Sequence, residues 1–326
     1  MVLVACGLGV VLFTLTDVFV TTVSMRGAGP LSSRLMNHIW RPAATSTRLS
    51  HRGLEIYGSL MLPLAVVIWG VLLYAGWALV FLAGPDAVVE ASSGAPAGWW
   101  DRIYFTGYTI STLGNGELRP DGGVWQGLTV AASVTGLALI TLAITYVTPV
   151  MSAVVTKRRV ARMIVALGPT PTDVLGKGWD GQSFQRIASH MTNLAPALAD
   201  LAQQHMAYPV LHYFHPAERA TALAPAVAVL DDALTLLRFG VAPAHRLDPV
   251  TLHTTMAAID VLLSALQAAH IDPADRAPDV PPLSVLERLD VPTVTDEEYR
   301  ADADGLTDRR ALLLGFVEND GWSWST

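Results

Sequence analysis

Long apolar segments without charges dominate the first half of the chain. No charged residue interrupts the stretch from Leu60 to Ala83 or the stretch from Val124 to Thr156. A helix needs about 20 apolar residues to cross the hydrocarbon core of a bilayer, and both segments are longer than that. A third apolar segment, Met1–Ser24, carries Asp17 and lacks the basic start of a signal peptide, so we expect it to be retained. The pattern predicts three membrane-spanning helices, with a buried helix as the alternative for the first segment.

Basic residues flank these segments unevenly. Between the first and second segments, before the acid Glu55, lie Arg26, Arg34, Arg41, Arg48 and Arg52. After the third segment come Lys157, Arg158, Arg159 and Arg162. The connection between the second and third segments carries mostly acids. Because cytoplasmic loops are enriched in Lys and Arg, we expect a multi-pass protein of the plasma membrane with its N-terminus and the acidic connection outside, and with the C-terminal half in the cytoplasm.

The second half of the chain shows amphipathic helical spacing instead. Three apolar stripes comprise Ile187, Met191, Leu194, Leu198 and Leu201, then Leu223, Val227, Leu230, Leu234 and Leu237, then Leu252, Met256, Ile259, Leu263 and Leu266. We expect Pro216 and Glu218 to open the second helix, and Gly240 and Asp272-Pro273 to end the second and third. This pattern predicts a small α-helical bundle. An acidic linker and a docking segment follow, with a short helix over Ala311–Val317 and two tryptophans, Trp322 and Trp324.

Composition supports this division. Of the 326 residues 52% are hydrophobic and only 15% are charged, against about 25% in typical soluble domains. Residues 1–156 carry seven acids and seven bases, whereas residues 157–326 carry 21 acids and 14 bases and supply the net charge of −7. A negative chain is a poor partner for nucleic acid. A single cysteine, Cys6, excludes an internal disulfide, a thiolate zinc cage and an iron–sulfur cluster.

The most specific motif lies in the connection between the second and third segments. Residues 99–120 read WWDRIYFTGYTISTLGNGELRP. We expect Asp101 to cap a short helix over Ile103–Ser111. Glycines then alternate with other residues, and this alternation allows left-handed backbone conformations that can turn successive carbonyls toward one side. Four such segments around an axis would form rings of oxygens that replace the hydration shell of a cation. The alternative is an extracellular glycine-rich turn that matches the motif by chance.

This arrangement resembles the pore module of the tetrameric potassium-channel superfamily over residues 54–156. The resemblance implies a selectivity filter at Thr112, Leu113, Gly114, Asn115 and Gly116. It also implies Glu117 at the outer mouth, Tyr104 and Phe105 as the aromatic pair of the pore helix, and Trp125 at the start of the inner helix.

Two residues depart from the pattern of that family. Asn115 replaces the usual Tyr or Phe between the two glycines, and Glu117 replaces the usual Asp. The family's aromatic residue packs behind the filter and braces its diameter. We therefore expect permeation by K⁺ with weaker exclusion of Na⁺ than is typical of the family. Asn115→Tyr should sharpen the preference for K⁺ if the space behind the filter takes the ring.

The third apolar segment carries further candidate pore residues. Ala138, Thr141 and Thr145 share one helical face and would suit a water-filled cavity, or else close helix packing. Gly136 and Pro149 are candidate gating hinges because each weakens a helix locally. No helix with regularly spaced arginines is evident, so voltage gating of that kind is not expected.

Two sets of ionisable residues remain. Asp17 is either a functional intramembrane acid or a carboxylate paired with a nearby arginine. The C-terminal half is dense in histidine: His190, His205, His212, His215, His245, His253 and His270. His212 and His215 are spaced for one metal ion, but with only two local ligands a structural pair is the favoured interpretation and no transition-metal site is predicted. The cluster would also permit proton sensing.

Together these observations predict an all-α membrane protein: a potassium-channel-like pore module of helix, pore helix, filter loop and helix, with an extra N-terminal span and a cytoplasmic helical domain. The expected domains are residues 1–53, 54–156, 157–273 and 274–326. The expected function is a homotetrameric cation channel in the lipid bilayer, with K⁺ or also Na⁺ as permeant ion at the filter carbonyls and no cofactor. The alternative is a non-conducting, membrane-anchored signalling or scaffold protein whose helical domain binds a partner. No constellation of catalytic residues supports an enzyme.

Overall fold

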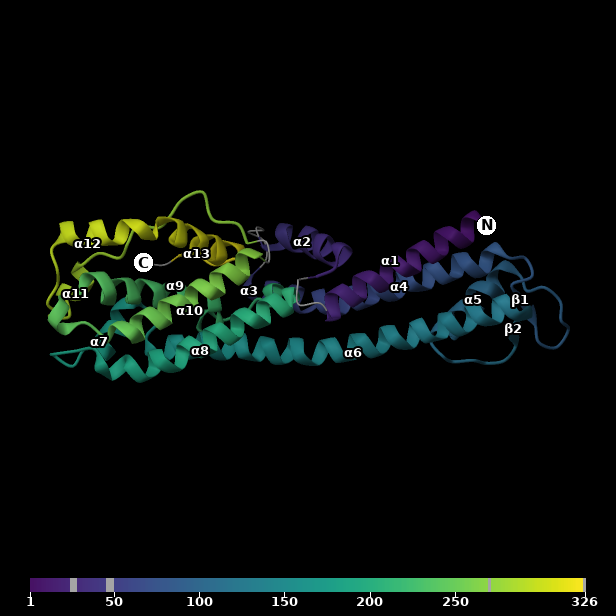
Figure 1. Ribbon diagram of the computed structural model, residues 1–326, viewed down its shortest axis with the longest axis horizontal. Helices are drawn as coiled ribbons and strands as arrows, with labels where there is room; N and C mark the ends of the chain where they lie inside the picture. The colour runs from purple at the N-terminus through teal and green to yellow at the C-terminus, as the bar shows by residue number, and fades with distance from the viewer. Residues whose placement is uncertain (24–27, 45–49, 269–270, 325–326) are drawn as a thin grey trace. The chain divides into compact units, whose positions relative to one another are not determined.

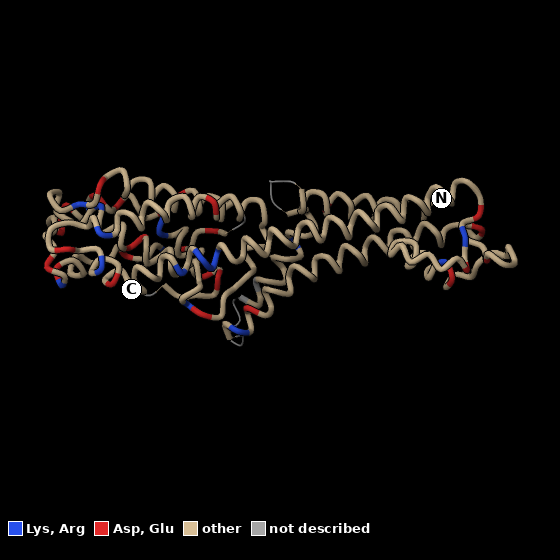
Figure 2. Tube along the Cα trace, turned by 90° about the horizontal axis from the view of Figure 1, so that it is seen from below, with Lys and Arg blue, Asp and Glu red and all other residues tan. Residues whose placement is uncertain are grey.

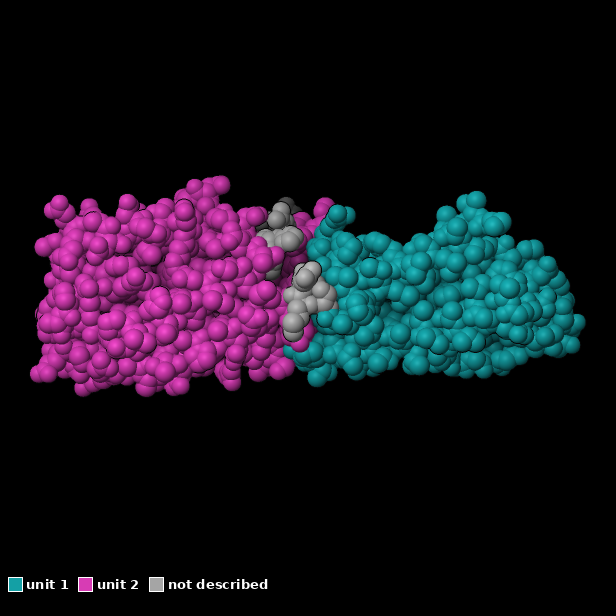
Figure 3. All heavy atoms as spheres, viewed as in Figure 1, with its two compact units in different colours: residues 1–36, 60–149 teal, residues 37–59, 150–326 magenta. Residues whose placement is uncertain are grey.

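The computed structural model describes residues 1–23, 28–44, 50–268 and 271–324. Arg26, Arg48 and His270 lie outside these residues, as does the side chain of Arg41. The chain divides into two compact units, which Figure 3 colours separately. Unit 1 comprises residues 1–36 and 60–149, and unit 2 comprises residues 37–59 and 150–326.

Unit 1 contains the three predicted apolar helices. They are α1 (Val2–Val23), α4 (Met61–Ala83) and the first part of α6 (Gly122–Leu167), all labelled in Figure 1. Helix α6 continues into unit 2 as one helix of 46 residues. Between α4 and α6 lie β1 (Val88–Glu90), α5 (Trp99–Ile110) and β2 (Leu118–Pro120). The two strands pair antiparallel, with Val89 opposite Arg119. Within unit 1, Figure 2 shows charged residues near this hairpin and long stretches without charge along the helices.

Helices α1 and α4 pack closely through glycine. A Cβ on Gly7 would come within 2.6 Å of the carbonyl oxygen of Gly76, and one on Gly76 within 2.8 Å of Val11 Cγ2. Small residues at such a crossing let two helix backbones approach, which is a frequent source of helix association in membranes. The first apolar segment is therefore packed along α4 and does not stand alone.

Unit 2 is built around one wholly buried helix, α9 (Leu223–Thr235), which continues into a π-helical turn, η3 (Leu236–Gly240). The other elements of unit 2 are the end of α2 (Pro30–Ala44), α3 (His51–Ser59), the end of α6, α7 (Pro171–Gly178), α8 (Gln185–Ala207), η1 (Pro209–Tyr213), η2 (Arg219–Thr221), η4 (Pro243–His245), α10 (Pro249–Ala268), α11 (Ser284–Glu287), α12 (Asp296–Ala303), η5 (Asp304–Leu306) and α13 (Thr307–Asn319). Every residue of the three predicted stripes is buried, and α8 packs against α10 through two of them.

The second bundle helix begins later than expected. Pro216 and Glu218 do not open α9, because the chain first forms the 3₁₀ turn η2 and enters the helix at Leu223. Two acids of α9 are buried and paired with arginines of α13. Arg310 donates to Asp232 at 2.8 Å, and Arg309 contacts both Asp231 and Asp260. Buried carboxylates need such partners, so α13 is tied to the centre of unit 2.

Four helices in the described part of the chain are long and apolar enough to cross a membrane. Three of these helices correspond to the predicted spans, and one of the three, His51–Ala83, combines α3 and α4. The fourth is α10. Half of the apolar window of α10 is buried within unit 2, and the helix has the lowest mean hydropathy of the four, 1.3. Its packing against α8 accounts for these apolar residues without a membrane.

Candidate pore and filter loop

The short helix α5 leads into the loop over Thr112–Gly116, the candidate filter, and begins earlier than predicted. It starts at Trp99 and not at Ile103, because Gly98 stands at the cap position. Asp101 lies in the first turn and accepts a hydrogen bond from the backbone nitrogen of Gly98 at 3.2 Å. Trp99 and Trp100 are both exposed at this end of the helix. Exposed tryptophans are typical of a membrane–water interface.

Arg102 fixes α5 to the end of α4. Its guanidinium donates to the carbonyl oxygens of Gly84 at 2.9 Å, Leu82 at 3.3 Å and Ala97 at 3.1 Å. The last carbonyls of a helix carry partial negative charge and attract a cation. Behind α5, the Tyr74 hydroxyl of α4 donates to the Ile103 carbonyl at 3.0 Å. No sequence motif indicates this role of Arg102, because its acceptors are backbone atoms.

The loop after α5 has an alternating backbone. Thr112, Gly114 and Gly116 have φ angles of 60°, 55° and 78°, while Leu113 and Asn115 between them have ordinary negative values. Thr112 is one of two non-glycine residues with positive φ in the described part of the chain. A Cβ at Gly114 or Gly116 would meet no atom within 4 Å, so these positions require glycine for conformation and not for space. The whole loop is exposed in the single chain.

Two tyrosines of α5 form hydrogen bonds with the segment that follows this helix, one with the loop and one with the start of β2. The Asn115 amide donates to the Tyr104 hydroxyl at 2.7 Å, and the Tyr108 hydroxyl donates to the Leu118 carbonyl at 2.9 Å. Glu117 lies beside the same amide, with its backbone nitrogen 3.4 Å from Asn115 Oδ1. The two residues of the aromatic pair therefore have different environments. Tyr104 contacts the loop, whereas Phe105 is buried edge-on against Phe81, with ring centroids 5.1 Å apart. Position 115 thus contacts α5 through a hydrogen bond and not through the aromatic ring that is usual in the channel family.

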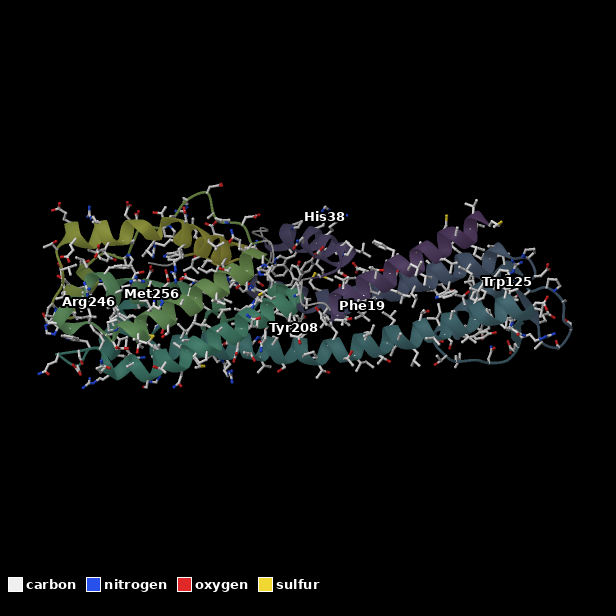
Figure 4. The ribbon with its side chains drawn as sticks, viewed as in Figure 1. Phe19, His38, Trp125, Tyr208, Arg246 and Met256 are labelled. Atoms are coloured by element: carbon white, nitrogen blue, oxygen red, sulfur yellow. The ribbon has the colours of Figure 1, made fainter. Side chains whose placement is uncertain are left out.

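Helix α6 packs behind α5 and α4 at defined points. A Cβ at Gly136 would overlap the carbonyl oxygen of Ile110, the last residue of α5. Gly136 therefore permits close approach of the two helices in this structure. Trp77 Nε1 of α4 donates to Thr135 Oγ1 at 2.9 Å. Trp125, which Figure 4 labels, lies in the first turn of α6. Its ring centroid is 6.4 Å from that of Phe81.

The remaining candidates on α6 face outward in the single chain. Thr141 and Thr145 are exposed and Ala138 is half-buried. The hydroxyl of Thr141 donates to the Leu137 carbonyl at 2.8 Å, and that of Thr145 donates within its own helix. The two threonine side chains are therefore not used in packing inside this chain. Pro149 lies within the continuous helix, at the residue where unit 1 ends.

Asp17 is fully buried in unit 1 and caps the second helix. Its Oδ1 accepts from the backbone nitrogens of Leu31 at 2.8 Å and Ser32 at 3.3 Å. Its Oδ2 accepts from Ser32 Oγ at 2.5 Å and from Trp69 Nε1 at 2.9 Å. Thr21 supports the same turn by accepting from the Gly29 nitrogen at 2.8 Å. The carboxylate thus joins α1, α2 and α4 through neutral donors.

The histidines of unit 2 have separate environments. His212 Nε2 lies 2.6 Å from Asn319 Oδ1, whereas His215 Nε2 lies 3.0 Å from His51 Nδ1. No group of three or more His, Cys, Asp or Glu side chains in the described residues could hold a metal ion. Burial lowers the pKa of His205 to about 3 and also lowers that of His212, so both rings are neutral in the fold.

Comparisons with known proteins address the family. A family model described as "Ion channel" matches residues 65–153, inside the segment for which a channel-like pore was predicted. The chain is 34% identical over 298 residues to the "Uncharacterized membrane protein YdjJ" of Bacillus subtilis (strain 168), which covers 91% of this chain and 87% of that protein. No solved structure matches the chain significantly. The protein therefore belongs to the same family of multi-pass membrane proteins as YdjJ and contains an ion-channel domain.

Proposed function

We propose that the protein is a homotetrameric cation channel that conducts K⁺ and is gated through the helices of unit 2. The observation that carries the proposal is the alternation of left-handed residues at Thr112, Gly114 and Gly116. A backbone that alternates in this way can present the carbonyls of Thr112, Leu113, Gly114 and Asn115 to one axis. Rings of such carbonyls replace the hydration shell of an ion in selective channels.

Assembly into four copies follows from the number of loops. One chain contributes one filter loop, and one loop cannot surround an ion. The loop and the Thr141–Thr145 face of α6 are both exposed in the single chain, as surfaces that face a shared axis would be. Backbone without helical structure at membrane depth is stable only where protein buries it or water lines it. A tetramer around a water-filled path supplies both conditions.

Cation flux into liposomes that contain the purified protein tests conduction. Gly114→Ala should abolish flux, because an alanine at φ 55° is strained and would turn the neighbouring carbonyls. Gly94→Ala is the matched control: Gly94 also has a positive φ, 69°, but lies outside the loop. Flux that survives in Gly114→Ala would contradict the filter assignment. No flux in the unmodified protein would favour the non-conducting signalling or scaffold protein.

Selectivity depends on how firmly the loop is held. The hydrogen bond from Asn115 to Tyr104 can restrain the outer part of the filter, although a single hydrogen bond contributes only about 0.5–1.5 kcal/mol. We propose K⁺ permeation with weaker exclusion of Na⁺. Tyr104→Phe should lower the K⁺ preference further, measured from reversal potentials, while Tyr57→Phe, which also loses one hydroxyl hydrogen bond, should not. An unchanged preference in Tyr104→Phe would contradict this role.

The Tyr104 hydroxyl affects the expected result of Asn115→Tyr. In Asn115→Tyr the new ring would compete with the Tyr104 hydroxyl for the space behind the loop. We therefore expect Asn115→Tyr to sharpen the K⁺ preference most when it is combined with Tyr104→Phe, which removes that hydroxyl. If the single and the double variant have equal selectivity, the two side chains do not share this space.

Assembly and orientation have direct tests. Mass measurement in mild detergent should give a tetramer, and a stable monomer or dimer would contradict the channel. The charge asymmetry predicts that a tag before Val2 is accessible only from outside and a tag after Thr326 only from inside. Tags on the same side of the membrane would mean that α1 does not span it.

A further inference from the structure

Three aromatic rings from distant parts of unit 2 stack together. His51 begins α3, His215 follows η1, and Trp322 follows α13. The rings of His51 and Trp322 are nearly parallel, with centroids 3.9 Å apart and an angle of 7°. His215 stacks against both, at 5.2 Å from His51 and 5.5 Å from Trp322. We call these three residues the His51 clasp.

The nitrogens of the clasp form a chain that ends at a buried acid. His51 Nδ1 lies 3.0 Å from His215 Nε2, and His215 Nδ1 lies 3.6 Å from Asp320 Oδ1. Two imidazole nitrogens at hydrogen-bond distance can have only one proton between them. If both nitrogens carry protons, two N–H groups face each other and the contact must open. The number of protons bound by the pair therefore controls its geometry.

A buried acid, Asp320, lies at one end of the clasp. Asp320 and His215 are both fully buried, and neither carboxylate oxygen of Asp320 has a hydrogen-bond partner in the described structure. Burial alone would raise the pKa of Asp320, but the charge of Lys157 and the contact with His215 outweigh it and hold this pKa below its usual range. The Asp320 side chain is thus an anion at the buried end of this chain of nitrogens.

Other groups that face the clasp oppose a second proton. The guanidinium of Arg219 lies 5.8 Å from the ring centre of Trp322. The Lys157 ammonium is buried and donates to the Phe214 carbonyl at 3.1 Å, next to His215 in the chain. His212 and His205 contribute no charge while they remain neutral. One buried anion, Asp320, therefore faces the two basic side chains Lys157 and Arg219, and a second bound proton would add positive charge that Asp320 cannot also balance.

Helix α3 connects the clasp to the pore module. A Cβ on Gly58 would overlap the carbonyl oxygen of Tyr213, so α3 lies directly against η1. Glu55 of α3 also pairs with Arg158 of α6 at 2.7 Å. After Leu60 the chain continues into α4, which packs against α5. A change at His51 therefore acts on the segment of chain that leads directly into the first helix of the pore domain.

We propose that His51, His215 and Asp320 form a proton-binding site through which acidification around unit 2 opens the His51 clasp and releases the start of α3. The first proton strengthens the chain from Asp320 to His51, and the second breaks the contact between the two rings. The effect on conduction rests on the proposed channel function, whereas the opening of the clasp does not.

Spin labels test the opening without any flux measurement. Because Cys6 is the only cysteine, Cys6→Ser gives a background for labels at Arg52→Cys and Glu318→Cys, two exposed positions on either side of the clasp. The distance between labels should lengthen when the full-length protein is taken from about pH 7.5 to about pH 5, a range in which histidine titrates. His215→Gln should abolish this change, and His51→Gln is the second variant in case the buried site does not tolerate glutamine.

An exposed histidine provides the control. His190→Gln on α8 should leave the change in distance intact. A distance that does not depend on pH, or a dependence that persists in both His215→Gln and His51→Gln, would overturn the proposal. Flux in liposomes separates this proposal from the channel proposal. If the clasp opens but the protein shows no flux at any pH, the channel is rejected and the proton site is supported. If flux occurs but the distance does not depend on pH, the proton site is rejected and the channel is supported.

Discussion

Removal of the Asp17 carboxylate should destabilise unit 1 strongly. In Asp17→Ala the backbone nitrogens of Leu31 and Ser32 lose their acceptor at the start of α2. Trp69 Nε1 keeps a weaker acceptor, because Ser32 Oγ lies 3.2 Å away. A buried donor without a partner costs about 1–3 kcal/mol, so the two backbone donors predict a loss of roughly 2–6 kcal/mol.

The loss can be measured as a shift of the thermal midpoint. Each kcal/mol corresponds to roughly 2–4 °C in domains of 150–250 residues, so the midpoint in detergent should fall by about 10 °C. Asp17→Asn keeps one oxygen for the helix cap and should lose roughly half as much. Thr16→Ala, at an exposed neighbour that bonds within its own helix, is the control. A midpoint of Asp17→Ala equal to that of the control would refute the capping role, and lost flux without lost stability would indicate a functional acid.

Two further outcomes follow from packing and titration. Gly136→Val should separate α6 from the end of α5 and lower both the thermal midpoint and flux, whereas Gly127→Val, where a Cβ meets no atom within 4 Å, should be neutral. Burial lowers the pKa of His205 to about 3 and also lowers the pKa of His212, so the unfolded chain binds more protons than the fold below about pH 6.5. Stability therefore decreases as the pH falls, by about 1.4 kcal/mol per pH unit for His205. His205→Gln should make the midpoint less dependent on pH in this range, and an equally steep dependence would contradict the burial argument.

Local patterns accounted for the helices and for the glycine-rich loop after α5. Apolar length predicted α4 and α6, and stripes at helical spacing predicted α8, α9 and α10, because these features depend on neighbours in sequence. The glycine alternation predicted left-handed backbone at Gly114 and Gly116. The left-handed Thr112 was not foreseen, since threonine rarely adopts this conformation without support from the surrounding structure.

Contacts between segments that are far apart in the chain could not be predicted from the sequence. The sequence suggested a functional acid or an arginine partner for Asp17. In the structure its carboxylate accepts hydrogen bonds from Leu31, Ser32 and Trp69, which lie 14, 15 and 52 positions further along the chain. The His51 clasp joins three segments, and no periodicity in one of them indicates the other two. The motif identified Asn115 as unusual but could not show that Tyr104 supplies a hydrogen bond to it. Such pairings are set by tertiary packing and require coordinates.

An experimental structure of the assembled protein in lipid with Rb⁺ or Tl⁺ tests the central claim most directly, because these ions scatter strongly and can replace K⁺. The account predicts four chains around one axis, with ion density on that axis between the carbonyl oxygens of Thr112, Leu113, Gly114 and Asn115. An assembly without fourfold symmetry would contradict it. So would a tetramer whose Thr112–Gly116 loops point away from the axis and enclose no ion.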